Sequence, residues 1–419
     1  MWYNWRMRQF VLACAAIAAA ASAWEPTLPT KFPSGVRVPS LDETYPHFVV
    51  RDGNAARLER VFAKGLRGEP LVVAVIGGSI TSDAHASRRE LQWGAVLADW
   101  FRHTFPKSSV EYVNAGIGAT GSDFGAYRVE QDVCVKRPDV VGVEYAVNDP
   151  DTPQSTEYNE GLIRHLLKTP SQPFVFQLSM IHQTRNNRQH RHVPVSAYYD
   201  IPHFSCRDAF LPLFEAGKLA HKDLAKDELH PDDIGHPYTG ALVCRYLDGK
   251  FAAFKAANRA PAVIPSMPEK PLVGTTFDTG SVWRMGEVKV LENKGFAVGG
   301  DSRNRRWKED ALRAANPGDR LVFEVDAPTC SILFYRIHGP MGRVKITVDG
   351  GEARICDGWF ALTWGGYTPL ELLWRDRPGR HVVAVEVLAD KASASEGHAF
   401  ELDAVLTAGD APKPLAAKK

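Results

Sequence analysis

The chain contains 419 residues, of which 44% are hydrophobic and 24% are charged, so it is long enough for two or three folded domains. This composition excludes a disordered, collagen-like or coiled-coil protein as the main architecture. Fifty Lys and Arg residues against 49 Asp and Glu residues leave a formal net charge of +1, which argues against nucleic acid as a partner.

The N-terminal residues have the layout of a secretory signal peptide. Two arginines precede an apolar run from Phe10 to Ala20, and small residues follow it. We therefore predict a signal peptide over residues 1–23, cleaved near Ala23, and a secreted or periplasmic protein. The run is too short to span a bilayer, so no permanent membrane anchor is expected. The segment ending at Cys14 leaves a lipoprotein signal as an alternative.

Apolar and amphipathic segments alternate after an N-terminal extension over residues 24–53. The expected strands are 71–76, 110–113, 140–147 and 173–178, and the expected helices are 54–66, 91–105, 124–135, 158–167 and 238–257. Parallel strands need helical crossovers, so this alternation predicts a parallel sheet covered on both faces. We assign the α/β domain to residues 54–259.

Four prolines mark a linker over residues 260–271. The β-type runs beyond it are 320–325, 331–337, 344–348 and 381–388, each bounded by turn residues. They predict an all-β sandwich over residues 272–408, with carbohydrate binding as a candidate role. The Ala-, Pro- and Lys-rich tail over residues 409–419 is expected to be disordered.

Five cysteines follow the signal peptide, an odd number that is too sparse for a disulfide scaffold. Cys330 and Cys356 could bridge neighbouring strands. Alternatively, all five are small buried hydrophobic residues, namely Cys134, Cys206, Cys244, Cys330 and Cys356. No CxxC pair indicates structural zinc.

A glycine-rich turn carries Ser79 directly after the first apolar run, in the order Gly77-Gly78-Ser79-Ile80-Thr81. Open α/β sheets place ligands at such carboxyl strand ends. The segment is neither a G-x-S-x-G nucleophile elbow nor a phosphate loop. Taken alone, it also fits an ordinary serine that caps the next helix.

Three further segments carry polar groups suited to catalysis. Asp227 and His230 are three residues apart, close enough for the carboxylate to orient the imidazole, although such pairs also occur on solvated surfaces. Asn114–Gly121 and Val147–Asp149 each follow an expected strand. Both are therefore expected at the same edge of the sheet as Ser79.

Together, in this order and spacing, the four segments resemble the sequence blocks of the SGNH, or GDSL, hydrolase family over about residues 70–257. The resemblance implies a flavodoxin-like three-layer α/β/α sandwich with a parallel sheet. It also implies a Ser-His-Asp triad, in which Ser79 is the nucleophile, His230 the general base and acid, and Asp227 the orienting carboxylate. No cofactor or metal is implied.

The same resemblance assigns the oxyanion hole to the Ser79 backbone N–H, an N–H of the Gly118-Ala119 turn and the Asn148 side-chain amide. Two departures from the family pattern stand out. Gly78 replaces the usual Asp before the serine, and the glycine of the second block aligns with either Gly118 or Ala119. Which of these two residues supplies the N–H is left open.

A basic loop over residues 184–193 follows the last expected strand of the α/β domain. We name His182 and Arg185 as candidate substrate-binding residues at the rim of the site. A metal site built from His182, His190 and His192, a rim for acidic sugars and a solvated surface loop are the alternatives.

These residues lead to the hypothesis of a secreted serine esterase that removes acetyl or other small acyl groups from a carbohydrate by an acyl-enzyme route. An acylated carbohydrate or another small ester is the expected partner, and the oligomeric state is left open. A lipase or thioesterase and a non-catalytic glycan-binding protein are the alternatives.

The β domain is expected to aid targeting and to leave the chemistry to the α/β domain. Its aromatic residues would form either a sugar-stacking platform or part of the sandwich core, and they are Trp359, Trp364, Tyr367 and Trp374.

Overall fold

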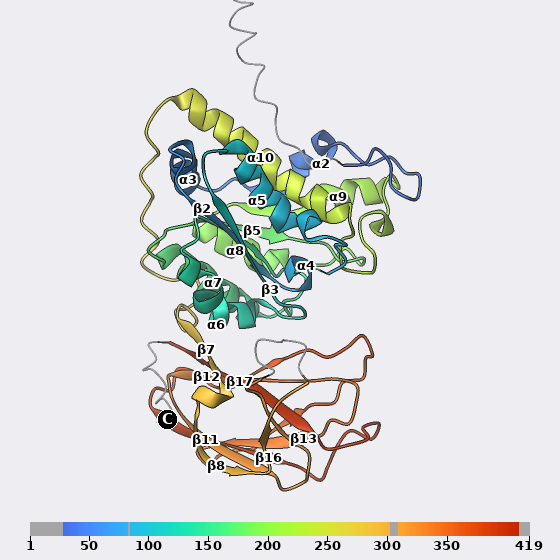
Figure 1. Ribbon diagram of the computed structural model, residues 1–419, viewed down its shortest axis with the longest axis vertical. Helices are drawn as coiled ribbons and strands as arrows, with labels where there is room; N and C mark the ends of the chain where they lie inside the picture. The colour runs from blue at the N-terminus through green and yellow to red at the C-terminus, as the bar shows by residue number, and fades with distance from the viewer. Residues whose placement is uncertain (1–27, 83, 302–308, 410–419) are drawn as a thin grey trace, which may run out of the picture.

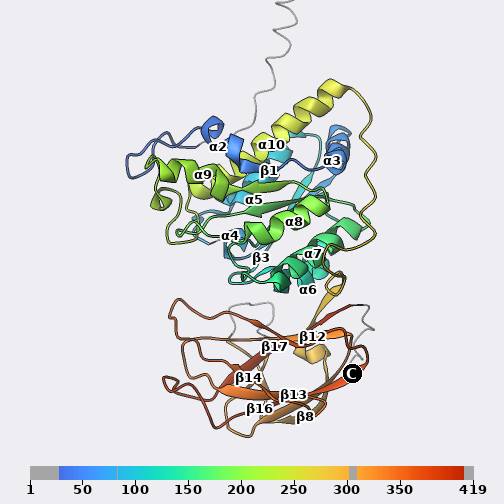
Figure 2. The same cartoon turned by 180° about the vertical axis from the view of Figure 1, so that it is seen from behind.

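The computed structural model describes residues 28–82, 84–301 and 309–409. The predicted signal peptide and nearly all of the predicted tail lie outside these residues. Figures 1 and 2 show an α/β unit stacked on a β-sandwich, with α6 (Ser122–Asp132) and α7 (Pro153–Lys168) facing the sandwich. Within the described ranges, no helix has the length and apolar character needed to cross a membrane.

The α/β unit is built on one six-stranded sheet with the order β1-β6-β5-β4-β2-β3. Its strands are β1 (Val49–Arg51), β2 (Leu71–Gly77), β3 (Val110–Gly116), β4 (Val140–Glu144), β5 (Phe174–Ser179) and β6 (His203–Ser205). The five strands from β2 to β6 are parallel, and their order is that of a flavodoxin-like sheet. The predicted fold class is therefore confirmed.

Helices cover both faces of this sheet, as the apolar strands require. On β2, Val73 and Val75 enter one apolar core, and Ala74 and Ile76 enter the other, because successive side chains point to opposite faces. The first core lies under α3 (Ala56–Leu66), α5 (Trp93–Thr104), α9 (Cys206–Glu215) and α10 (Gly235–Ala257), and the second lies under α6, α7 and α8 (Gln189–Tyr198).

The N-terminal extension differs from expectation, because part of it belongs to the sheet unit. Residues 41–51 form α2 (Leu41–Phe48) and β1, which pairs antiparallel with β6. Thr44 Oγ1 lies 2.8 Å from Tyr238 Oη, so α2 is hydrogen-bonded to α10. β1 and β6 have only three residues each, too few for a detectable alternation pattern.

Some helices and strands begin or end at other residues than expected. Helix α7 begins at Pro153, five residues before the expected start at Tyr158, because Thr152 caps it by accepting a hydrogen bond from the Ser155 N–H. The β4 strand ends at Glu144, and a turn then carries Asn148.

Residues 258–279 contain no helix or strand and run along the outside of the α/β unit (Figures 1 and 2). Two antiparallel sheets follow, one in the order β15-β12-β17-β10-β9 with β7 also paired to β17, and one in the order β14-β13-β16-β11-β8. The strands are β7 (Gly280–Arg284), β8 (Lys289–Lys294), β9 (Ala297–Val298), β10 (Leu312–Ala314), β11 (Arg320–Asp326), β12 (Thr329–Phe334), β13 (Arg343–Val348), β14 (Arg354–Asp357), β15 (Leu370–Trp374), β16 (Arg380–Val387) and β17 (Phe400–Ala408). The two sheets enclose a third apolar core, as predicted for a sandwich.

The two units share packing and ion pairs. Phe277, just before β7, packs against Tyr158 at a ring-centroid distance of 4.2 Å and against Tyr127 at 5.8 Å. Arg164 of α7 contacts the carboxylate of Asp278 at 2.8 Å with both groups buried. The sandwich is therefore docked on α6 and α7 and is not separated from them by a free linker.

All five described cysteines are buried and free of disulfides. Cys330 lies on β12 and Cys356 on β14, strands of different sheets, so the alternative of small buried hydrophobic residues applies.

Candidate active site

Three polar segments follow the carboxyl ends of β2, β3 and β4, which are neighbours in the sheet. Ser79 begins α4 (Ser79–Ser82) after β2, the turn 117–119 follows β3, and Asn148 follows β4. The strand order reverses between β2 and β4, and such a switch point leaves a crevice at the carboxyl edge of the sheet. The topology thus brings these segments together.

A continuous chain of hydrogen bonds joins Ser79, His230 and Asp227. His230 Nε2 lies 2.8 Å from Ser79 Oγ, and His230 Nδ1 lies 2.7 Å from Asp227 Oδ2. The ring can therefore take the hydroxyl proton on one nitrogen while the carboxylate holds the N–H of the other. The structure brings together the three residues that the sequence named.

The carboxylate of Asp227 is held by its own loop. Its Oδ1 accepts hydrogen bonds from the backbone N–H groups of Leu229 at 2.8 Å and His230 at 2.7 Å. Burial alone raises the pKa of Asp227, but these amides and the His230 ring outweigh burial and hold the pKa well below its ordinary value. The group is therefore ionised at neutral pH, as an orienting carboxylate must be.

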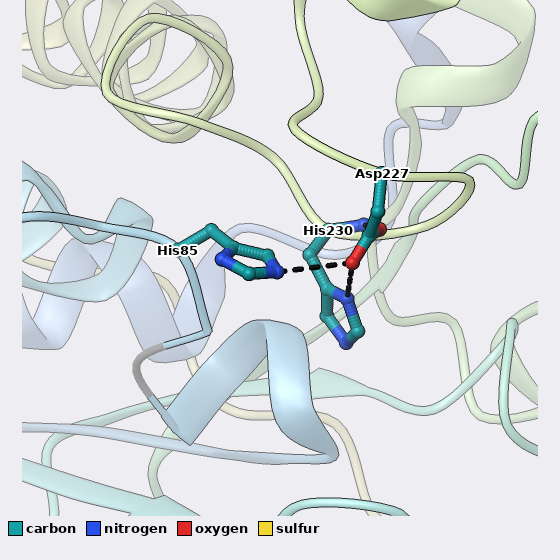
Figure 3. Close-up of side chains that lie close together, drawn as sticks. All are labelled: His85, Asp227 and His230. Carbon is teal, nitrogen blue, oxygen red and sulfur yellow. Dashed lines mark hydrogen bonds and ion pairs between the residues drawn. The ribbon is translucent and has the colours of Figure 1, made fainter. Parts of the chain in front are cut away.

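A second imidazole reaches the same carboxylate. His85 Nε2 lies 3.0 Å from Asp227 Oδ2, the atom that also binds His230 (Figure 3). The two imidazole rings meet edge to face, with centroids 5.3 Å apart. Sequence reasoning missed His85, because nothing in its local pattern points to a partner 142 residues away.

Gly78 leaves no room for a side chain in this structure. A Cβ on Gly78 would lie 2.6 Å from Asn148 Oδ1, so the amide of Asn148 occupies the space that a side chain would need. Asn148 lines the same cavity as Ser79, Gly118 and Ala119. The predicted oxyanion residues therefore line one cavity together with Ser79.

Ala119 adopts φ of +57°, in the left-handed region that favours glycine. Gly118 has no positive φ, and a Cβ there would meet only Ser79 Cβ, at 3.8 Å. The backbone therefore supports Ala119 as the equivalent of the glycine in the family's second block.

Buried polar groups support the turns that carry the site. Arg128, fully buried on α6, donates to the carbonyl oxygens of Gly77 at 3.2 Å and Ala115 at 2.6 Å. His192 Nε2 lies 2.7 Å from Asp149 Oδ2 with both side chains buried, directly after Asn148. These contacts anchor the ends of β2 and β3 and the Asn148 turn.

Glu144 lies beneath the site at the end of β4. Burial raises its pKa to about 7, although Thr81 Oγ1 donates a hydrogen bond to Glu144 Oε2 at 3.0 Å. No partner contacts Glu144 Oε1 among the described residues. The segment after Ser79 therefore rests on a carboxyl group that is protonated over much of the acidic range.

Ser79, Asp227 and His230 line a cavity of about 970 Å³ to which both units contribute. The β-sandwich contributes Tyr335, Trp364 and Tyr367 to its wall. Trp364 is 50% exposed, and its ring lies 5.9 Å from that of Tyr367. The β domain was expected to leave the chemistry to the α/β domain. In the structure it instead forms part of the wall of the cavity that contains Ser79.

The other two tryptophans that the sequence singled out differ in their burial. Trp374 is buried in the sandwich core, and Trp359 is half-buried. The sequence could not separate these residues, because the core and the cavity wall use the same residue types.

Of the two candidate substrate-binding residues, one lines the cavity and the other does not. His182 lines the cavity, and its Nε2 lies 3.8 Å from Glu228. Arg185 is exposed and is not among the described residues that line the cavity. The alternative metal site is not assembled, because His182, His190 and His192 contact Thr184, Asp151 and Asp149 respectively.

Two groups of metal-ligating side chains occur among the described residues. One is His85, Asp227 and His230 itself. The other is Glu130, Cys134 and His165, where Glu130 and His165 already pair at 2.7 Å and burial raises the pKa of the Cys134 thiol to about 12. A thiol held in its protonated form is a poor metal ligand.

Known structures resemble this chain across both units. A two-domain esterase active on acetylated mannans, co-crystallised with mannopentaose, is 27% identical; the match covers 88% of this chain and 98% of that one, with a TM-score of 0.78. A further structure of a two-domain esterase active on acetylated mannans is also 27% identical; the match covers 88% of this chain and 99% of that one, with a TM-score of 0.79. An acetylxylan esterase from Geobacillus stearothermophilus matches 43% of this chain and 95% of its own at 19% identity, with a TM-score of 0.36.

No family model and no curated protein matches the sequence. The two-domain esterases nevertheless align over nearly their whole length, through the flavodoxin-like sheet and the sandwich alike. The chain therefore resembles two-domain esterases active on acetylated mannans over both of its units.

Proposed function

We propose that the protein is a secreted serine esterase that removes acetyl groups from a polysaccharide by an acyl-enzyme route. The observation that carries the proposal is the hydrogen-bonded series Ser79–His230–Asp227, open to a cavity that aromatic residues of the second unit also line. A nucleophile with a paired base meets the chemical requirement, and a large cavity with an aromatic wall suits a sugar chain.

In the acylation step, His230 Nε2 takes the proton of Ser79 Oγ as that oxygen attacks the acetyl carbonyl carbon. The tetrahedral oxyanion is held by the backbone N–H of Ser79, an N–H of the turn at Gly118 and Ala119, and the Asn148 amide. The intermediate then collapses, the bond to the sugar oxygen breaks, and His230 returns the proton to that oxygen.

In the deacylation step, a water molecule repeats the attack on the acetyl-Ser79 ester. His230 takes a proton from the water, the second intermediate collapses, and acetate leaves while Ser79 Oγ regains its proton. Asp227 stays ionised throughout and stabilises the transient imidazolium, in keeping with its depressed pKa.

The wall of the cavity supports a carbohydrate as the substrate class. Sugar rings present apolar faces that stack on aromatic side chains, and Trp364 and Tyr367 supply such a surface near Ser79. The two-domain esterases that resemble this chain act on acetylated mannans, and one was crystallised with mannopentaose. We therefore favour an acetylated mannan-type polysaccharide as the substrate.

The secretion part of the proposal rests on the N-terminal sequence alone, where basic residues precede a short apolar run and small residues follow. It predicts a mature N-terminus at Trp24. N-terminal sequencing of the exported protein from its native host tests this part separately.

The function is tested by incubating the mature protein with acetylated mannan, acetylated xylan and p-nitrophenyl esters of two to twelve carbons. We expect acetate release from mannan, and the Ser79→Ala variant should keep its circular dichroism spectrum and lose about 10³-fold or more in turnover. Retention of a tenth of the activity by that variant would refute Ser79 as the nucleophile.

The same panel, extended by an acyl thioester and a glycan-binding assay, also separates the alternatives. Preference for long acyl chains would indicate a lipase, and activity on thioesters alone would indicate a thioesterase. Binding of glycan without turnover of any ester would indicate a lectin-like protein.

A further inference from the structure

His85 and Ser79 are close in the chain, whereas Asp227 and His230 lie on a distant loop before α10. Residues 84–87 touch that distant loop and the start of α10 at three points. His236 Nε2 lies 3.0 Å from the Ala84 carbonyl oxygen, and the N–H of Ser87 lies 2.7 Å from Asp233 Oδ1. The third point is the contact between His85 and Asp227.

The contact of His85 differs from the other two because it reaches the catalytic carboxylate. Asp227 Oδ1 is occupied by two backbone amides, so Oδ2 alone faces the catalytic ring. His85 Nε2 approaches this oxygen at 3.0 Å from a separate segment of the chain (Figure 3). The carboxylate of Asp227 is therefore held both by the backbone amides of its own loop and by His85.

We propose that His85 is a positioning residue, which holds the Asp227 carboxylate and thereby fixes the His230 ring against Ser79. The inference rests on the proposed function and deepens it. An N–H donor at Oδ2 limits rotation of the carboxylate, and the orientation of His230 depends on that carboxylate. His85 itself takes no proton from Ser79, because His230 Nε2 occupies the position beside Oγ.

The backbone at His85 is held in an uncommon conformation, with φ of +64°. Non-glycine residues are found there mainly when the surroundings impose it. The three contacts with the distant loop and the start of α10 supply that constraint. They place the imidazole over Asp227 although its side chain is 38% exposed.

The test compares three substitutions at His85 with a control beside it. His85→Phe keeps a planar ring without a donor, His85→Ala removes the ring, and His85→Gln places an amide N–H near the Nε2 position. The control, Ser87→Ala, removes the hydroxyl that contacts Asp233 Oδ2 at 2.6 Å. It keeps the backbone contact of residue 87 with Asp233 Oδ1 and leaves the contact between His85 and Asp227 in place.

Two rates are measured for each variant: hydrolysis of p-nitrophenyl acetate, and inactivation by diethyl p-nitrophenyl phosphate, which reports how readily Ser79 attacks. We expect His85→Phe and His85→Ala to lower kcat and the inactivation rate about 10-fold, with KM within about twofold, because one hydrogen bond to a charged group is lost. His85→Gln should recover to within about threefold of wild type, and Ser87→Ala should match wild type.

Wild-type rates in both donor-less variants would overturn the proposal, and so would a change confined to KM, which would make His85 a substrate contact. Equal impairment of His85→Gln and His85→Phe would also overturn it. If either His85→Phe or His85→Ala has an altered circular dichroism spectrum, the rates of the other of these two variants test the proposal. If the wild type itself neither hydrolyses esters nor reacts at Ser79, the proposed function fails first, and that result is distinct from all of these.

Discussion

A Cβ atom on Gly78 would lie 2.6 Å from Oδ1 of Asn148, closer than nonbonded carbon and oxygen atoms approach in folded proteins. The position of the Asn148 side chain and the lack of a side chain at residue 78 therefore depend on each other. Gly78 is buried, and its backbone N–H lies 3.3 Å from the Glu144 carbonyl oxygen, so this turn has little freedom to move aside.

The first prediction follows from this contact. Gly78→Ala should push the Asn148 amide away from Ser79 and lower kcat about 10- to 100-fold, because a 1 Å misplacement of a catalytic group costs about that much. Steady-state hydrolysis of p-nitrophenyl acetate measures the effect. Gly249→Ala is the matched control, since a Cβ there meets no atom within 4 Å. Full activity of Gly78→Ala would show that the turn adapts.

The second prediction concerns Asn148. Asn148→Ala should lower kcat about 10²- to 10³-fold with a small change in KM, because an oxyanion donor acts mainly as charge develops in the transition state. The kinetic constants for p-nitrophenyl acetate decide the matter. A rise in KM with an unchanged kcat would contradict a role in the oxyanion hole.

The third prediction separates sugar binding from chemistry. Trp364→Ala should lower kcat/KM for an acetylated mannooligosaccharide about 10-fold, since a stacked aromatic ring contributes roughly 1 kcal/mol beyond its area. Turnover of p-nitrophenyl acetate should stay within about twofold, because that ester is too small to reach the second unit. Leu362→Ala, at another exposed apolar residue, is the control. Equal losses on both esters would place Trp364 in the chemistry.

The fourth prediction uses the buried carboxyl group of Glu144, whose folded-state pKa of about 7 exceeds the ordinary 4.5. The folded state holds this proton more tightly, so the stability it contributes is present below pH 4.5 and is lost as the pH rises through 7. Glu144→Gln should therefore match wild type in acid and exceed its free energy of unfolding at pH 8 by at most about 3 kcal/mol. Urea unfolding at pH 4.5 and pH 8 measures this difference. A difference that does not depend on pH would contradict the assignment.

The fifth prediction concerns the docked sandwich. Ending the chain after Ala260 removes Phe277 and Asp278 and exposes the apolar side chains of α6 and α7 that they cover. We expect the truncated protein to aggregate and to lose turnover of both polymer and p-nitrophenyl acetate, as measured by size-exclusion chromatography and activity assays. A monomeric truncation with wild-type activity would show that the α/β unit stands alone.

The amino-acid sequence by itself determined the features that are encoded locally. The continuous apolar run 71–76 predicted a strand buried on both faces, and 173–178 predicted a further strand. The turns bearing Ser79 and Asn148 fell at strand ends. The spacing of Asp227 and His230 placed carboxylate and imidazole in one turn, where the structure also has them in contact. Such features depend on neighbours within a few residues, so a single sequence carries them.

Only the tertiary structure decided which distant segments meet. His85 and Asp227 are 142 residues apart, and Trp364 enters the cavity of Ser79 from a separate unit. Neither contact has a local signature, because a histidine after a turn and a tryptophan between short strands suit many environments. The same reason hid β1, whose three residues form a strand only because the edge of β6 offers them hydrogen-bond partners. Contacts of this kind follow from how sheets and helices pack, which no short stretch of sequence records.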